Sequence, residues 1–211
     1  HRSGCIPWDT GYTAQRDASC VRYLQNASKI VSILPLAVHD IRSDTVKFMA
    51  HYPEPAVQAV LQFSQKRSIV EPASEVVSYH VDRLLGIRMV PPTTWVTIKL
   101  KALRQAVQGT ADLEYMVWID DVFFRALDKL GLVRVDVDGD RVVTASAQLW
   151  LTDTHPINYS VFNVPQDWPQ YFVGGRKLPL PDGLPLLALS DVAVLDFVLG
   201  LPDRSARLYV T

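Results

Sequence analysis

Three charged residues have the types and settings that phosphoryl transfer requires. Lys47 lies in a short apolar run, Glu75 opens an amphipathic segment, and Asp203 lies in a loop-like segment near the end of the sequence. Phosphoryl transfer needs little covalent help, so a protein must hold the triphosphate, neutralise its charge and orient the attacking hydroxyl. A strand lysine fixed by a helix glutamate would align the phosphates, and a loop aspartate would accept or orient the hydroxyl proton.

Each of these residues also has an ordinary structural interpretation. Lysine and glutamate are mostly found at the surface, and the helix macrodipole favours a glutamate in a first turn even without a partner. A loop aspartate commonly accepts hydrogen bonds from nearby backbone amides. Residue types alone therefore leave both interpretations open.

The elements that must position these residues are predicted from hydrophobic periodicity. Residues 1–28 look irregular, and the first regular segments follow at 30–36 and 45–49. The second of these reads as a short strand with Lys47 at its centre. Two prolines two residues apart then end the strand, because proline cannot continue a ladder.

The next segment has the pattern of an amphipathic helix. It is predicted from Pro72 to Leu85, with Ser74 as its cap and Gly86 just past its end. Its apolar face is predicted to consist of Val77, His80, Val81, Leu84 and Leu85. Glu75 then lies in the first turn, where it would form an ion pair with Lys47.

The remaining chain alternates strand and helix patterns. In order, we predict a strand at 95–100, a helix at 113–131 closed by Gly131, a hairpin at 133–143 turning at Asp138 and Gly139, and a strand at 147–151. The helix is predicted to bury Trp118, Ile119, Val122, Phe123, Leu127 and Leu130. A Pro- and Gly-rich segment at 156–185 is interpreted as a long loop or lobe connection. The last helix is predicted from Leu186 to Leu199, with Leu189, Val192, Leu195, Phe197 and Val198 mostly buried.

Two segments resemble the signature motifs of one kinase group. From Glu75 to Pro92, a glutamate-bearing helix runs into His-x-Asp-Arg, two hydrophobic residues, Gly, and then Val-Pro-Pro. The segment from Asp191 to Arg204 is similar to an Asp-Phe-x-x-Gly-Asn-x-Asp-Arg catalytic pattern. Both resemble the four-jointed and Golgi casein kinase group of secretory-pathway kinases. Upstream, the residues around Lys47 are similar to the strand that carries that group's nucleotide lysine.

The resemblance implies an α+β, two-lobed protein-kinase-like fold. The N-lobe is expected at about 29–145 and the beginning of the C-lobe at about 146–211, after an irregular segment at 1–28. Catalytic roles are implied for Lys47, Glu75 and Asp203. Nucleotide-binding roles are implied for Lys47 and for the connector strand at Gln148, Leu149 and Trp150, whose backbone would hold the adenine; an ordinary core strand is the alternative for this run.

Four further residues are expected to support the site. Asp82 and Arg83 are interpreted as a structural brace between the helix and its lobe. Asp196 lies in an apolar helix, where an acidic group is costly unless it is paired, and Arg204 is a suitable partner.

The pattern departs from the group in two places. Leu201 stands where the group usually has Asn, and no counterpart of its metal-binding aspartate precedes Thr211. We therefore expect this fragment to bind nucleotide and metal poorly and not to turn over.

The resemblance implies transfer of the ATP γ-phosphate to a hydroxyl of a secreted protein or glycan, with Mn²⁺ or Mg²⁺ as cofactor. A pseudokinase that acts as a lumenal binding or allosteric partner is the alternative. A lipid kinase of related fold is a weaker alternative.

Composition and short motifs indicate the cellular location of the protein and the classes of partner it could bind. The chain has 211 residues, 48% of them hydrophobic, so it can bury a sizeable core, and its formal net charge of −1 disfavours nucleic acid as a partner. The apolar run at 30–38 is too short to span a bilayer, so any signal anchor would lie upstream. Cys5 and Cys20 could form a disulfide in an oxidising compartment, and Asn26 and Asn158 begin glycosylation sequons. Together these features favour the Golgi lumen or the extracellular space.

Other kinds of site are disfavoured. Aspartates at 136, 138 and 140 begin like a calcium loop, but the glycine falls one place early and Ala147 stands where a bidentate glutamate is needed. The histidines have no ligand spacing, so no protein metal site is predicted. A serine hydrolase is excluded by the lack of a Gly-x-Ser-x-Gly elbow.

Overall fold

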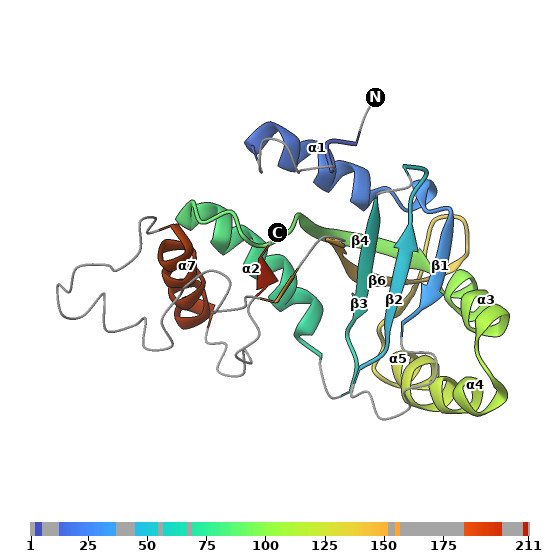
Figure 1. Ribbon diagram of the computed structural model, residues 1–211. Coiled ribbons are helices and arrows are strands. Elements are labelled where there is room, and N and C mark those ends of the chain that lie inside the picture. Colours follow the sequence, from blue (N-terminus) through green and yellow to red (C-terminus); the bar gives the residue numbers. More distant parts are fainter. Residues whose placement is uncertain are drawn as a thin grey trace. The chain divides into compact units, whose positions relative to one another are not determined.

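The computed structural model has the mixed α+β architecture that was predicted, with helices and a curled antiparallel sheet (Figure 1). It describes residues 3–5, 13–36, 45–54, 57–66, 69–151, 155–156, 184–199 and 209–210. The chain forms two compact units: His1–His80 with Val90–Trp150, and Val81–Met89 with Leu151–Thr211. The division after Trp150 lies five residues beyond the expected end of the N-lobe, and the segment 81–89 joins the second unit.

The first unit contains a six-stranded antiparallel sheet. Its strands are β1 (Ser32–Pro35), β2 (Lys47–His51), β3 (Gln58–Phe63), β4 (Thr93–Lys99), β5 (Val133–Val135) and β6 (Arg141–Leu149). The strand order is β1-β2-β3-β6-β4, and β5 pairs with the N-terminal end of β6. The predicted strand at 147–151 is therefore the end of the long strand β6, which begins at the hairpin.

One face of this sheet carries the hydrophobic core and is called the core face below. Residues that lie opposite each other in the register share a face, which places Phe48 beside Leu61 and Phe63 beside Ala145. The rings of Phe48 and Phe63 contact the ring of Phe123, with centroids 5.7 and 5.4 Å away. All three rings are fully buried.

Helices α3 (Leu100–Thr110), α4 (Leu113–Ile119) and α5 (Arg125–Lys129) lie together on one side of the sheet (Figure 1). Helix α3 was not predicted, although Leu100, Leu103 and Val107 are buried at helical spacing. The predicted helix at 113–131 is confirmed, and Gly131, with φ of +67°, ends it. The predicted burial of Val122 and Leu130 is wrong, since both side chains are exposed.

A wide turn inside this helix explains which of its residues are buried. Tyr115, Ile119, Phe123 and Leu127 are all buried, at a constant spacing of four residues. On an ideal α-helix such a spacing drifts by about 40° per step, because 3.6 residues complete a turn. Residues Asp120–Phe124 form a π-helical turn, which takes more residues per turn and keeps the four side chains on one face.

The prediction of an irregular segment at 1–28 is wrong for residues 14–25, which form a helix. Helix α1 spans Ala14–Gln25, and the Thr13 side chain caps it by accepting a hydrogen bond from the Arg16 amide. The helix is polar overall, so periodicity gave little signal, and it packs against β4 and β6. It is followed by a short 3₁₀ turn, Ala27–Lys29.

A disulfide bond between Cys5 and Cys20 ties the chain start to α1. Both sulfur-bearing side chains are buried. The Ser3 amide and hydroxyl donate to the two carboxylate oxygens of Glu54, each at 2.7 Å, and so attach the same segment to the loop after β2.

Removing this disulfide should destabilise the first unit. With a sequence separation of 15 between the cysteines, we expect the free energy of unfolding of the Cys5→Ser, Cys20→Ser variant to fall by about 3 kcal/mol, since the crosslink restricts the unfolded chain. Urea unfolding followed by circular dichroism measures the change. The wild type in reducing agent is the matched control and should give the same curve as the double variant; no loss of stability in either would contradict the prediction.

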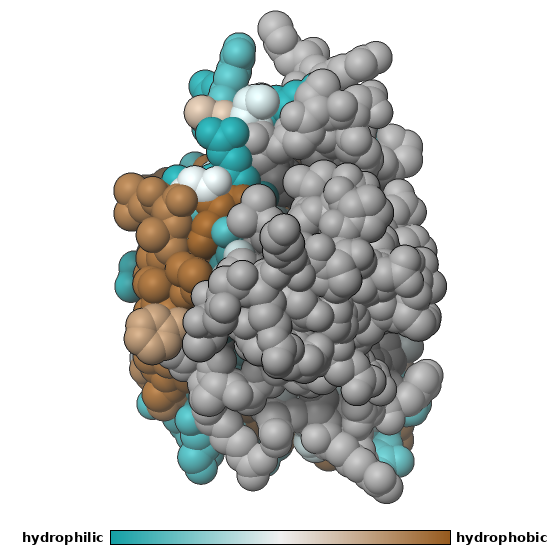
Figure 2. Space-filling view, turned by 60° about the vertical axis from the view of Figure 1, so that its left-hand side comes forward, coloured by the Kyte–Doolittle hydropathy of each residue, from teal (hydrophilic) through white to brown (hydrophobic). Residues whose placement is uncertain are grey.

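The described part of the second unit contains helix α7 (Leu184–Leu199) and the strand pair β7 (His155–Pro156) and β8 (Tyr209–Val210). The helix is confirmed to within two residues of its predicted start. Val192 and Leu195 are buried as predicted, whereas the predicted burial of Phe197 and Val198 is wrong, since both side chains are exposed. Figure 2 shows apolar side chains gathered on one part of the described surface.

Candidate functional site

The sheet face opposite the core face carries the predicted lysine and is called the polar face. Cross-strand register places Lys47, Gln62, Ser146 and Trp95 in one row across β2, β3, β6 and β4. The next row consists of Met49, Val60, Gln148 and Thr93. A cation, several hydrogen-bonding groups and an aromatic ring therefore share one surface of the sheet.

Lys47 forms an ion pair with the helix that follows β3, but with a different glutamate from the one predicted. Its Nζ lies 3.0 Å from Glu71 Oε1, and the side chains of Lys47 and Glu71 are 36% and 22% exposed. Glu71 is the first residue of helix α2 (Glu71–Leu85), where the macrodipole also favours a carboxylate. The predicted pair with Glu75 is corrected because Lys47 opens β2 instead of lying at its centre, which brings it to the first residue of the helix.

Glu75, one helical turn later, belongs to a separate hydrogen-bond network. Gln148 Nε2 donates to Glu75 Oε2 at 3.1 Å and to Thr93 Oγ1 at 3.2 Å. The Thr93 hydroxyl donates in turn to the carbonyl oxygen of Pro91 at 2.8 Å. Two carboxylates four residues apart on a helix repel each other, and here each has its own polar partner on the sheet.

Several polar atoms around this row are buried without a hydrogen-bond partner among the described residues. They are Gln62 Oε1, Ser146 Oγ and Glu71 Oε2; His51 Nδ1, at the other end of β2, is a further atom of this kind. The side chain of Ser146 is fully buried and that of Gln62 almost fully. An unsatisfied buried polar group costs about 1–3 kcal/mol, so these atoms call for a ligand group or water. Neither Gln62 nor Ser146 was predicted as a site residue; a polar side chain on the same strand face as other polar side chains was the available signal.

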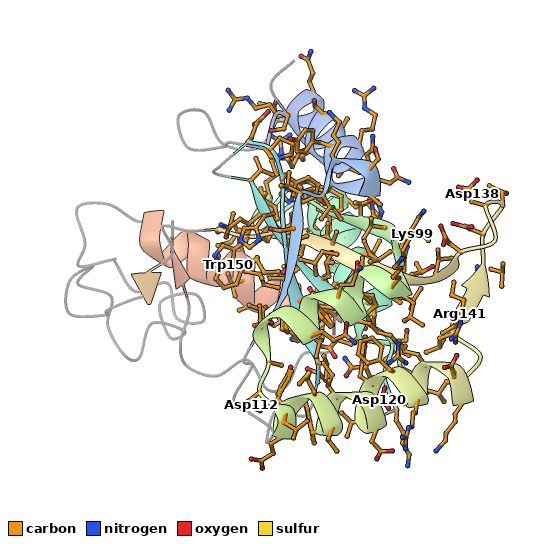
Figure 3. All side chains as sticks on the ribbon, turned by 90° about the vertical axis from the view of Figure 1, so that its right-hand side faces the viewer. Lys99, Asp112, Asp120, Asp138, Arg141 and Trp150 are labelled. Atoms are coloured by element: carbon orange, nitrogen blue, oxygen red, sulfur yellow. A yellow bond between two sulfur atoms is a disulfide. The ribbon has the colours of Figure 1, made fainter. Side chains whose placement is uncertain are left out.

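The predicted adenine-binding strand lies at the end of β6. The Leu149 amide donates to the Pro92 carbonyl at 2.9 Å, and the Trp150 amide donates to the Gln58 carbonyl at 2.8 Å. An adenine contact through either amide would have to replace one of these bonds. Trp150 is 44% exposed and lies at the opposite end of β6 from Arg141 (Figure 3). It is also the last residue before the chain passes into the second unit.

Asp82, predicted to brace the helix against the rest of its lobe, contacts the segment that directly follows the helix. Its side chain is fully buried; Oδ1 accepts from the Met89 amide at 2.9 Å, and Oδ2 pairs with the guanidinium of Arg83. Gly86 ends α2 with φ of +73°, and the Ile87 amide donates to the Asp82 carbonyl across this turn. The side chain and the main chain of Asp82 therefore both fix the segment after the helix.

Helix α2 presents the opposite side from the one predicted. Its buried side chains are Pro72, Val76, Tyr79 and Asp82, whereas Val77, His80, Leu84 and Leu85 are exposed. Ser74 does not cap the helix but lies within it, and its hydroxyl donates to the Val70 carbonyl. The prediction failed because it followed apolar spacing, whereas the helix is turned so that Glu71 and Glu75 reach the sheet.

The acidic hairpin uses its carboxylates for the turn itself, in agreement with its interpretation as a turn. Asp136 Oδ1 accepts from the amides of Asp138 and Asp140, both at 2.9 Å. Asp140 pairs with Lys99, and this hydrogen bond together with the negative charge of the carboxylate raises the pKa of Lys99. Within the described ranges, no group of three or more His, Cys, Asp or Glu side chains could hold a metal ion.

The other predicted residues divide into described and undescribed ones. Asn26 is exposed, and its Oδ1 accepts from both the amide and the hydroxyl of Ser28. Asp196 is half-buried in α7. Asp203, Arg204 and Asn158 lie outside the described residues, as does most of the segment 156–185. None of the described helices is long and apolar enough to span a membrane.

No protein-family model and no curated protein sequence matches this chain.

Proposed function

We propose that this chain is the nucleotide-binding part of a secretory-pathway kinase, which transfers the ATP γ-phosphate to a hydroxyl of a secreted protein or glycan. The ion pair between Lys47 on β2 and Glu71 on α2 carries the proposal. Kinases fix a strand lysine with a helix glutamate in this way, so that the lysine is held where it meets the phosphates. The motif resemblance around Glu75 to Pro92 supports the same assignment.

The chemistry of the polar face suits a nucleotide. The Lys47 ammonium has three N–H donors, of which one points to Glu71, and its side chain is partly exposed. Ser146 and Gln62 lie in the same row with an unpartnered hydroxyl and amide oxygen. The half-exposed rings of Trp95 and Trp150 lie on β4 and just beyond β6, and aromatic faces stack readily on bases.

A divalent cation is part of the proposal, as Mn²⁺ or Mg²⁺ bound together with ATP. Glu71 Oε2 is a buried carboxylate oxygen with no hydrogen-bond partner among the described residues, and both ions prefer oxygen ligands. Such an ion usually takes one or two protein carboxylates and completes its shell with phosphate oxygens and water. The cation would neutralise phosphate charge, and Lys47 would orient the same phosphates. Asp203 would orient the acceptor hydroxyl.

Two features support a lumenal or extracellular location. Cys5 and Cys20 are joined in a disulfide, a bond that persists in oxidising compartments. The sequon at Asn26 is exposed at the end of α1, where a glycan could be attached.

One observation favours the pseudokinase alternative. Glu75, the glutamate singled out by the resemblance, accepts a hydrogen bond from the neutral amide of Gln148. In that alternative the chain binds nucleotide or a protein partner without turnover, and the Lys47–Glu71 pair is structural.

Binding and transfer assays test the proposal. We expect ATP with Mg²⁺ or Mn²⁺ to raise the melting temperature of the protein and to bind in calorimetry. Transfer of labelled γ-phosphate to an acidic secreted peptide or a glycan is assayed in parallel, and this fragment is expected to give none. Measurable transfer to the peptide or glycan would overturn that expectation and favour the kinase over the pseudokinase alternative. Transfer to phosphoinositide would select a lipid kinase, and the lack of any ATP binding would overturn the nucleotide assignment.

A further inference from the structure

We infer that Gln148 is a positioning residue, which holds the first two turns of α2 on the sheet so that Glu71 meets Lys47. The side-chain amide of Gln148 joins Glu75 on the helix to Thr93 on β4, and Gln148 itself lies on β6. Its consequence for ATP binding rests on the proposed function, whereas its consequence for the geometry of Lys47 does not.

The helix is attached to the sheet at two separate points. Lys47 on β2 holds Glu71, and Gln148 on β6 holds Glu75. Strand β3 lies between β2 and β6 in the sheet, so the two anchoring strands are about 10 Å apart. A helix held at one point can still rotate or slide, but two contacts one turn apart and two strands apart fix both movements.

Hydrophobic burial alone does not select this orientation of α2. The side of the helix with Val77, Leu84 and Leu85 is exposed, and Leu84 is 86% exposed. The buried stripe instead includes Asp82 beside Val76 and Tyr79. Since the apolar pattern favours the opposite rotation, directional polar contacts have to fix the observed one, and the described residues offer Lys47 and Gln148 for this.

The residues of this network lie close to the points where the chain passes between the two units. Residues 71–80 of α2 belong to the first unit and residues 81–85 to the second. Gln148 lies two residues before the chain passes into the second unit, and Thr93 lies three residues after it returns to the first at Val90. The network therefore fastens the helix, the strand that leaves the unit and the strand that re-enters it.

Lysine reactivity gives a direct readout of this role. The Lys47 amine is labelled with an acylating reagent under limiting conditions, and its modification is quantified by mass spectrometry in the folded protein. Gln148→Met keeps the size of the side chain but removes the donor, and Gln148→Asn keeps an amide that is too short to reach Glu75. We expect either change to raise the labelling rate of Lys47 by about tenfold, the factor expected for the loss of a hydrogen bond to a charged group.

Two controls separate positioning from general destabilisation. Glu75→Gln keeps an acceptor for Gln148, so labelling of Lys47 should stay near the wild-type rate. Gln105→Met, on the exposed side of α3, should leave it unchanged. If one Gln148 variant does not fold, the other is measured. Thr93→Val removes the second acceptor of Gln148 and is a third test, in which we expect a smaller increase in the labelling rate of Lys47.

The outcomes for geometry and for function are distinct. Wild-type labelling rates in folded Gln148 variants would overturn the positioning role. If labelling rises and ATP affinity falls by about tenfold, as for a lost charge-assisted contact, the inference and the proposed function are both supported. If labelling rises but the wild type binds no ATP, the positioning role stands and the nucleotide assignment fails.

Discussion

In the Lys47→Met variant, ATP affinity is expected to fall by about a hundredfold, because an ammonium–phosphate contact is charge-assisted and Met cannot replace it. Lys47 is partly exposed and held by Glu71 at 3.0 Å, so it can contact a ligand without losing its anchor. Calorimetry with ATP and Mg²⁺ measures the change. Lys101→Met, which removes an exposed lysine from α3, is the matched control and should bind as the wild type does.

The two glutamates of α2 should respond differently in the same assay. Glu71→Gln removes the charge that fixes Lys47 and is expected to weaken ATP binding by about tenfold. Glu75→Gln keeps its hydrogen bond with Gln148 and should change affinity much less. If Glu75→Gln were the more damaging change, or if Lys47→Met bound ATP within twofold of the wild type, the assignment of the Lys47–Glu71 pair would be wrong.

The Phe123→Ala variant should be the least stable of the single core variants considered. Phe123 is fully buried on the core face, where its ring contacts Phe48, Phe63 and Phe124. Removing a buried phenyl ring leaves a cavity and costs about 3–5 kcal/mol, a large part of the stability of a typical domain. Urea unfolding measures this loss. The variant is expected to be partly unfolded at room temperature if the wild type is of ordinary stability.

Two further variants test the cavity explanation. Phe123→Leu refills much of the space and should recover more than half of the stability lost in Phe123→Ala. Val122→Ala changes the exposed neighbouring position and should cost less than about 0.5 kcal/mol. Equal losses at positions 122 and 123 would show that the π-helical turn, and not the buried ring, limits stability.

Local backbone chemistry made several elements predictable. Gly86, Gly131 and Gly139 all have positive φ values, and each marks a helix end or a turn that was predicted from the sequence. Strand β2 ends at His51, two residues before Pro53, and strand alternation located β4 and the hairpin of β5 and β6. These features depend only on the backbone conformations that a few neighbouring residues can adopt. The identities of those residues are read directly from the sequence.

Features that depend on distant partners were not predictable in the same way. Helix α1 is polar and is held by a disulfide and by packing on β4 and β6, so its periodicity was uninformative. The orientation of α2 was predicted from its apolar residues, and it is reversed because Lys47 and Gln148 bind its glutamates. In both cases the deciding contacts lie far away in the sequence.

The sequence by itself determined the α+β class, the positions of most helices and strands, and the presence of a strand lysine followed by a glutamate-bearing helix. Only the tertiary structure decided that Glu71 pairs with Lys47, that Gln148 holds Glu75, and that Gln62 and Ser146 lie in the same row. An ion pair or hydrogen bond needs its two groups within about 3–4 Å of each other. Strand register and helix rotation set that distance, and a shift of one residue or one helical turn changes the partner.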